Sequence, residues 1–228
     1  MKEYYWIIRQ SPLFDSADEE TLDHILRCLD AYIAVFGKGE IICHYGDCTA
    51  YAGMVLEGKA AIAVPGPDGE ESSIRTAEPA ETFGCSHSCM DSQPSLITVT
   101  AKKQTKILFL KLSKLFRPEA ICCPHASLVI ANLLKQTAAA NLSQSRRIHI
   151  MSQKTIRGKL EVFLDQSLDR KNTAILSMNR QELADYLGVE RSALSREMGR
   201  MKREGLIDYC KNQITVLKKK EGNGCRCN

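Results

Sequence analysis

The stretch from Asn179 to Arg203 carries residue types that suit the binding of a nucleic-acid duplex. Its second half presents polar side chains at helical spacing: Arg191, Ser192, Ser195, Arg196 and Arg200. Arginine can donate a pair of hydrogen bonds to guanine, and serine can bond base edges or phosphates. This chemistry predicts a helix whose outer face reads double-stranded DNA.

Two short helices must position those side chains. Asn179 can cap a first helix, with Glu182 three residues later in a capping-box arrangement. Arg180 and Gln181 fall in the first turn of that helix, where we expect them also to face DNA. Gly188 allows a sharp turn. The inward positions of the two helices are Leu183, Ala184, Leu187, Leu194, Met198 and Met201. The pattern predicts a helix-turn-helix over 179–203, and the alternative is a helical hairpin that binds protein.

The segment after the helix pair reads as a β-wing. Two short apolar runs flank Lys211-Asn212, which predicts two strands with Lys211 near the DNA backbone. Residues 146–228 contain 18 lysines and arginines against 10 acidic residues, whereas the chain as a whole contains 31 against 27. A basic C-terminal third favours a nucleic-acid-binding module.

The N-terminal half has a different pattern. Ser16 is expected to cap a short helix whose apolar residues recur at helical spacing: Leu22, Ile25, Leu26 and Leu29. Short apolar segments separated by glycine-containing turns then fill 31–117, with strands expected at 59–64, 97–100 and 106–112. Turns at intervals of about 8–12 residues indicate an antiparallel sandwich or barrel.

Residues 124–151 read as one helix, roughly 42 Å long at about 1.5 Å per residue. Pro124 suits its first turn, and no glycine or second proline interrupts it. An apolar stripe runs along it: Ile130, Leu134, Ala138, Leu142 and Ile148. A small barrel cannot cover so long a stripe, which predicts a two-stranded seam in a homodimer. The alternative is a helix packed only within its own chain.

Composition excludes several classes of protein. Apolar runs such as 107–110 are far shorter than the roughly 20 residues that a membrane span needs. The N-terminus lacks the apolar core of a signal peptide, so we expect no membrane contact and a cytoplasmic protein with its 10 cysteines reduced. No P-loop, G-x-S-x-G or H-E-x-x-H motif is present, so the sequence does not favour an enzyme.

Residues 12–217 resemble the Crp/Fnr family of bacterial regulators, most closely a subgroup from anaerobic Gram-positive bacteria. The matching pieces are Pro12-Leu13-Phe14, Lys38-Gly39-Glu40, Gly46-Asp47, Tyr51 through Gly58, Phe83-Gly84, the long helix and Arg191–Arg196. The resemblance implies an α+β fold: a cyclic-nucleotide-binding-like antiparallel jelly roll over 1–117, a dimerisation helix over 118–152, and a winged helix-turn-helix over 153–228. It also implies homodimers on palindromic operators, with RNA polymerase as a further partner.

The resemblance places an effector pocket at Phe83, Gly84, Cys85, Ser95 and Leu96. Members that bind cAMP carry a glutamate after Phe-Gly and an Arg-Ser pair about ten residues later. Here Cys85 follows Gly84, the later pair reads Ser95-Leu96, and no arginine lies between Arg75 and Arg117. A buried cyclic phosphate would lack a guanidinium partner. We therefore expect an effector other than cAMP or cGMP, and we predict no cofactor.

Cysteine and histidine residues form three groups that leave a second hypothesis open. They are Cys43-His44 with Cys48, Cys85 with His87 and Cys89, and Cys122-Cys123-Pro124-His125. None has the paired C-x-x-C spacing of structural zinc sites. Residues 1–27 contain no cysteine, which disfavours the iron–sulfur cluster of the oxygen-sensing members. Cys85, His87 and Cys89 are weak metal candidates in a loop near the pocket, so the alternative is a redox-, metal- or haem-responsive regulator.

Overall fold

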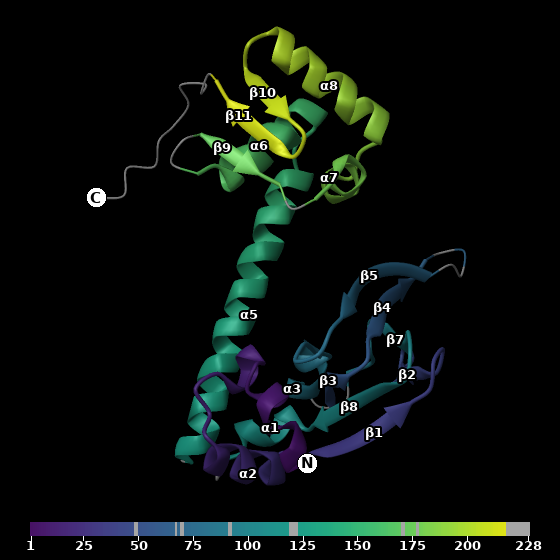
Figure 1. Ribbon diagram of the computed structural model, residues 1–228, viewed down its shortest axis with the longest axis vertical. Helices are drawn as coiled ribbons and strands as arrows, with labels where there is room; N and C mark the ends of the chain where they lie inside the picture. The colour runs from purple at the N-terminus through teal and green to yellow at the C-terminus, as the bar shows by residue number, and fades with distance from the viewer. Residues whose placement is uncertain are drawn as a thin grey trace. The chain divides into compact units, whose positions relative to one another are not determined.

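The computed structural model describes residues 1–47, 50–66, 68, 71–90, 93–118, 123–169, 172–176 and 178–217. The chain forms two compact units, Met1–Ala138 and Ala139–Asn228. Their boundary falls inside helix α5 (Pro124–Met151), which coincides with the helix predicted over 124–151 (Figure 1). The division of the chain at 117 and 152 stays a prediction.

The N-terminal unit contains two four-stranded sheets, and their strand pairs are antiparallel. The first has the order β1 (Tyr32–Phe36), β8 (Thr105–Leu110), β3 (Ala52–Glu57) and β6 (Thr82–Phe83). The second has the order β2 (Ile41–Cys43), β7 (Thr98–Ala101), β4 (Ala60–Pro65) and β5 (Glu71–Ala77). The antiparallel sandwich is confirmed, and β4, β7 and β8 overlap the three strands predicted from the sequence.

The central strands of the first sheet, β8 and β3, are buried on both faces, because each face packs on a different core. In β8, Ile107 and Phe109 join the core between the sheets, whereas Leu108 and Leu110 join a second core under the helices. Successive side chains of a strand point to opposite faces, which produces this division. The second core also takes in Ala126, Val129 and Leu133 at the start of α5.

Short helices cover the outer face of the first sheet, and they correct two sequence expectations. They are η1 (Lys2–Tyr4), α1 (Tyr5–Ile8), η2 (Pro12–Phe14), α2 (Glu19–Cys28), α3 (Cys85–Cys89) and η3 (Leu112–Phe116). Asp18, not Ser16, caps α2: its carboxylate accepts a hydrogen bond from the Thr21 amide at 2.8 Å, while Ser16 adopts a left-handed φ of 62°. The predicted loop at 85–89 is the helix α3.

Gly53 in β3 lies against the ring of Phe83, where a Cβ atom would come within 2.1 Å of Cζ. We expect Gly53→Ala to lower the free energy of unfolding by about 1–3 kcal/mol, because the ring must move. Gly199→Ala is the control, because a Cβ there meets no atom within 4 Å and helix propensity should stabilise it by about 0.5–1 kcal/mol. Urea unfolding followed by circular dichroism measures both variants. Equal stability of wild type and Gly53→Ala would contradict this packing.

In its described residues, the C-terminal unit contains the end of α5, three further helices and a three-stranded antiparallel sheet. The helices are α6 (Ile156–Ser167), α7 (Arg180–Leu187) and α8 (Arg191–Arg203). The sheet has the order β10 (Ile207–Cys210), β11 (Gln213–Val216) and β9 (Thr173–Ile175). The helix-turn-helix and the two wing strands are confirmed. The sequence reading did not identify α6 or β9 individually.

Candidate nucleic-acid interface and effector pocket

The two features predicted to begin and end α7, the capping box at Asn179 and the glycine turn at Gly188, are confirmed. The Asn179 side chain accepts hydrogen bonds from the amides of Gln181 (2.9 Å) and Glu182 (3.0 Å), and Glu182 accepts one from the Asn179 amide (2.7 Å). Gly188 ends the helix in the left-handed conformation, with φ of 59°. Leu183, Ala184 and Leu187 are fully buried. The turn therefore fixes the direction in which α8 begins.

Helix α8 separates an apolar inner face from a polar outer face. Leu194, Met198 and Met201 are buried in the core of the unit. Five predicted DNA-binding side chains on α8 are exposed: Arg191, Ser192, Ser195, Arg196 and Arg200. Glu190 caps α8 without a side-chain hydrogen bond, so the first-turn amides receive no bond from their cap. Such amides can bind a phosphate.

An ion-pair network that sequence reasoning missed attaches α8 to α6. Arg157 donates to Glu197 at 2.7 Å and makes two bonds to Glu204 at 2.8 and 2.9 Å. Glu197 also pairs with Arg200 at 3.2 Å. The partners are 40 and 47 residues from Arg157, so no short-range sequence signal marks them. Paired bonds of this kind fix orientation, which holds the outer face of α8 in place.

Helix α6 and the end of α5 also hold α7. The Lys159 ammonium donates a hydrogen bond to the Leu187 carbonyl at 3.0 Å. Leu187 is the last residue of α7, where a backbone carbonyl has no partner within the helix, and Lys159 supplies that partner. Tyr186 packs against Phe163, with ring centroids 5.6 Å apart, and the Arg147 guanidinium lies 5.6 Å from the Tyr186 ring. The helix pair thus has a rigid support of the kind that precise recognition requires.

Arg180, which the sequence predicts to face DNA, makes contacts within the C-terminal unit, and its role at DNA stays a prediction. Its guanidinium lies 5.0 Å from the Tyr209 ring and contacts the Met198 sulfur at 3.0 Å. It also reaches the Lys211 carbonyl at 3.5 Å, and burial lowers the pKa of Arg180 below its usual value. Arg180 therefore joins α7 to α8 and the wing, while Gln181 stays exposed and bonds Asp185 at 2.8 Å.

The wing presents Lys211 at the turn between β10 and β11. Lys211 is exposed and has a left-handed φ of 51°. Lys202 on α8 pairs with Asp208 at 2.6 Å and lies 5.0 Å from the Tyr209 ring, so its charge is used within the unit. Lys211 consequently remains available as the exposed wing cation that the sequence predicts.

A cavity of about 490 Å³ opens between the two sheets of the N-terminal unit. Its lining comprises Ile42, Cys43, Asp47, Ala50, Tyr51, Phe83, Gly84, His87, Ser95, Ile97, Val99 and Phe109. Phe83, Gly84 and Ser95 lie where the sequence placed them. Cys85 and Leu96 do not: Cys85 packs on the core under the helices, and Leu96 is 57% exposed. The helical turn of α3 directs Cys85 away and brings His87 to the cavity.

The charge of the cavity lining is unfavourable for a phosphate. Among the described residues that line it, Asp47 is acidic and none is lysine or arginine. Arg75 in β5 is bound instead to the Thr82 carbonyl at 2.6 Å and to Glu81 at 3.4 Å. The Ser95 hydroxyl donates to the Ile97 carbonyl at 2.8 Å. An anionic ligand would therefore lose its hydration without gaining a cationic partner.

The thiols near the cavity lie in apolar surroundings. Burial raises the pKa of Cys43 and of Cys85, and it raises the pKa of Cys89 to about 11. Burial of this kind disfavours the thiolate, which is the reactive form of cysteine. Within the described ranges, no three histidine, cysteine or acidic residues come together as a metal site. The hypothesis of a metal at Cys85, His87 and Cys89 gains no support from this geometry.

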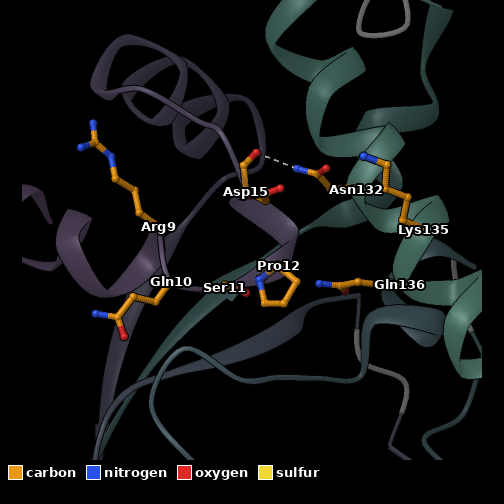
Figure 2. Close-up of a pocket in the computed structure, with 8 residues that line it drawn as sticks. All are labelled: Arg9, Gln10, Ser11, Pro12, Asp15, Asn132, Lys135 and Gln136. Atoms are coloured by element: carbon orange, nitrogen blue, oxygen red, sulfur yellow. Dashed lines mark hydrogen bonds between the residues drawn. The ribbon is translucent and has the colours of Figure 1, made fainter. Parts of the chain in front are cut away.

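A second, more open pocket of about 300 Å³ lies between the N-terminal segment and α5, within the N-terminal unit (Figure 2). Asn132 on α5 donates to the Asp15 carbonyl at 2.9 Å and to the Leu13 carbonyl at 3.3 Å. The buried Ser11 hydroxyl has no hydrogen-bond partner among the residues that the structure describes. These contacts attach the segment around Pro12-Leu13-Phe14 to the long helix.

Two family models match the chain: a cyclic nucleotide-binding domain over residues 33–117 and a Crp-like helix-turn-helix domain over residues 160–221. The chain belongs to the Crp/Fnr family of transcription regulators. Crp/Fnr proteins are regulators and not enzymes, in agreement with the sequence prediction. The Gram-positive subgroup stays a prediction.

Two solved structures with a TM-score of 0.50 show this fold at low sequence identity, and a third structure matches the chain with a lower score. The N-terminal domain of a transcriptional regulator from Streptomyces coelicolor A3(2) is 24% identical, covers 59% of this chain and 94% of its own, and has a TM-score of 0.50. The c-di-GMP-responsive global regulator CLP of Xanthomonas campestris is 16% identical, covers 89% of this chain and 100% of its own, and has a TM-score of 0.50. The catabolite activator protein of Thermus thermophilus is 22% identical, covers 90% of this chain and 93% of its own, and has a TM-score of 0.47. No curated protein sequence matches the chain. In the ranges that the structure describes, no helix has the length and apolarity to cross a membrane.

Proposed function

We propose that this Crp/Fnr regulator reads a two-fold-symmetric DNA site as a homodimer. The observation that carries the proposal is the outer face of α8, where four polar side chains are exposed together: Arg191, Ser192, Ser195 and Arg196. Arg157 of α6 holds this helix in place through its bonds to Glu197 and Glu204. A rigid helix with this polar face suits the major groove. We assign base contacts to Arg191 and Arg196, and backbone contacts to Gln181, Ser192, Ser195, Arg200 and Lys211.

The exposed stripe of α5 supports the dimer. Leu134, Leu142 and Ile148 are 67%, 63% and 68% exposed, and the residues from 137 to 149 lie open to solvent. A 28-residue helix with large apolar side chains on one face is typical of a two-stranded seam. A second copy of this chain would cover the stripe. We extend the proposal to the cytoplasm, where the dimer would meet both the chromosome and RNA polymerase.

For the effector, we propose a small, mostly apolar molecule that is neutral or positively charged. The cavity between the sheets supplies aromatic and aliphatic walls, and its polar side chains include Asp47, Tyr51, His87 and Ser95. A site of this composition holds apolar ligands and orients them through a few polar contacts. The effector would bias an equilibrium between two states of the regulator by binding one state better than the other.

Cyclic nucleotides are expected not to bind. Titration calorimetry of the purified chain with cAMP, cGMP and c-di-GMP should give no binding at micromolar affinity, because the described lining lacks a cation for the phosphate. A dissociation constant in the micromolar range or tighter for any of the three would contradict the proposed effector chemistry. Such a result would leave the DNA-binding proposal unaffected.

Selection from a pool of random DNA duplexes tests the proposed function. The full chain is expected to enrich a palindrome whose half-sites lie about one helical turn (~34 Å) apart. Affinity for the enriched duplex should fall steeply as salt rises, because bound phosphates release their counterions. A pool that remains random after repeated rounds would rule out sequence-specific reading by α8.

A further inference from the structure

Four side chains form a contact cluster in the N-terminal unit, outside the cavity between the sheets and outside the helix-turn-helix. Thr21 and His24 come from α2, while Cys123 and His125 flank Pro124 at the start of α5. The Cys123 sulfur lies 3.3 Å from His24 Nε2, and His125 Nδ1 lies 3.0 Å from the Thr21 hydroxyl. The rings of His24 and His125 pack with centroids 4.8 Å apart and planes 34° apart. We call this set the thiol–imidazole cluster.

The cluster gives Cys123 a base that can take its proton. An imidazole nitrogen in hydrogen-bond contact with a thiol is the arrangement that activates cysteine nucleophiles. The Thr21 hydroxyl holds His125, and the packed ring of His125 in turn limits how His24 can rotate. Cys123 and His24 are both partly exposed, so a small reagent can reach the sulfur.

Cys123 differs in this respect from the thiols near the cavity. The Cys43 thiol donates a hydrogen bond to the His44 carbonyl at 3.5 Å. A carbonyl oxygen is too weak a base to take the thiol proton. Cys85, Cys89 and Cys123 are all packed against the core under the helices, and burial raises the pKa of Cys85 and of Cys89. Cys28 and Cys210 are exposed. The structure records a contact with an imidazole only for Cys123 among these described cysteines.

We propose that Cys123 is a modification site whose reactivity His24 raises, and that its reactants are small soft electrophiles and hydroperoxides. His24 Nε2 takes the thiol proton, and the thiolate sulfur attacks the terminal oxygen of the hydroperoxide. The O–O bond breaks as the S–O bond forms, and the imidazolium returns the proton to the leaving alkoxide. Sulfur is oxidised to a sulfenic acid and the hydroperoxide is reduced to an alcohol. This inference goes beyond DNA binding and does not depend on it.

The rate of alkylation at individual cysteines tests the proposal. The full chain is treated with limiting iodoacetamide at neutral pH, and peptide mass spectrometry reports the extent of labelling at each cysteine. Cys210 is the reference, because it is more exposed to the reagent than Cys123. We expect Cys123 to react about tenfold faster than Cys210, and His24→Gln to remove that difference without changing labelling at Cys210.

Two further measurements show whether His24 acts as a base toward Cys123 or only packs against it. Imidazole added to His24→Ala should restore labelling at Cys123, whereas circular dichroism should show that both His24 variants remain folded. A hydroperoxide followed by dimedone should tag Cys123 in the wild type, and Cys123→Ser should carry no tag at that position. Equal labelling of Cys123 and Cys210, an unchanged Cys123 rate in His24→Gln, or failure of the imidazole rescue would overturn the proposal. Zinc that co-purifies and blocks labelling until chelated would overturn it too.

Discussion

Replacing Leu142 by glutamate is expected to make the regulator monomeric and to lower its affinity for the selected duplex by about 100- to 10,000-fold, the range lost when two linked contacts become one. Leu142 is 63% exposed on α5, in the stripe that a second copy would cover. In the dimer, each introduced carboxylate would lie in the apolar seam, where burying a charge is strongly unfavourable.

Sedimentation measures the oligomeric state, and titration of a labelled duplex measures the affinity. Ser143→Glu is the matched control, because Ser143 is exposed on the same helix but its side chain points away from the stripe. That variant should stay dimeric and bind the duplex as the wild type does. A Leu142→Glu protein that sediments as a dimer and keeps its affinity would refute a seam along this face of α5.

Arg196→Ala is expected to cost about 1–3 kcal/mol per half-site, the value of one arginine–guanine pair, and therefore about 2–6 kcal/mol of binding when both subunits of the dimer carry the change. The loss should also relax the base preference at one position per half-site. Arg196 is exposed on the second turn of α8, and Leu194 and Met198 on either side of it in the sequence are buried. The helix therefore keeps its place when the outer side chain is removed.

Affinities for a panel of duplexes that differ at one half-site position distinguish the kinds of contact. Arg203→Ala, at the opposite end of α8, removes the same charge and should produce a small loss that is similar for every duplex. A base contact by Arg196 predicts a loss concentrated at one position. If Arg196→Ala instead weakens all duplexes equally, its side chain contacts a phosphate and the assignment of base contacts is wrong.

The parts of the fold that the sequence predicted are those with short-range signals. The capping box of Asn179 and Glu182 and the turn at Gly188 each act over a few residues, and each is confirmed. Short apolar segments separated by turns also located β4, β7 and β8. The support of α8 by Arg157 escaped prediction, because its partners lie 40 and 47 residues away and only folding brings them together.

The errors have equally local causes. Ser16 and Asp18 both suit a helix cap, and the left-handed backbone of Ser16 leaves the role to Asp18. The family resemblance placed Cys85 in the effector pocket, whereas in helix α3 Cys85 packs on the core under the helices and His87 lines the cavity. Tyr51, just before β3, and Phe109 in β8 reach the cavity from positions far apart in sequence, a convergence that no spacing rule reveals.

The mass of the complex on the selected duplex tests the central proposal most directly. A dimer that reads two half-sites through α8 predicts two copies of the chain on one duplex. It also predicts that a duplex with a single half-site binds far more weakly, since the second set of contacts is lost. One copy per palindromic duplex, with equal affinity for the single half-site, would contradict the account.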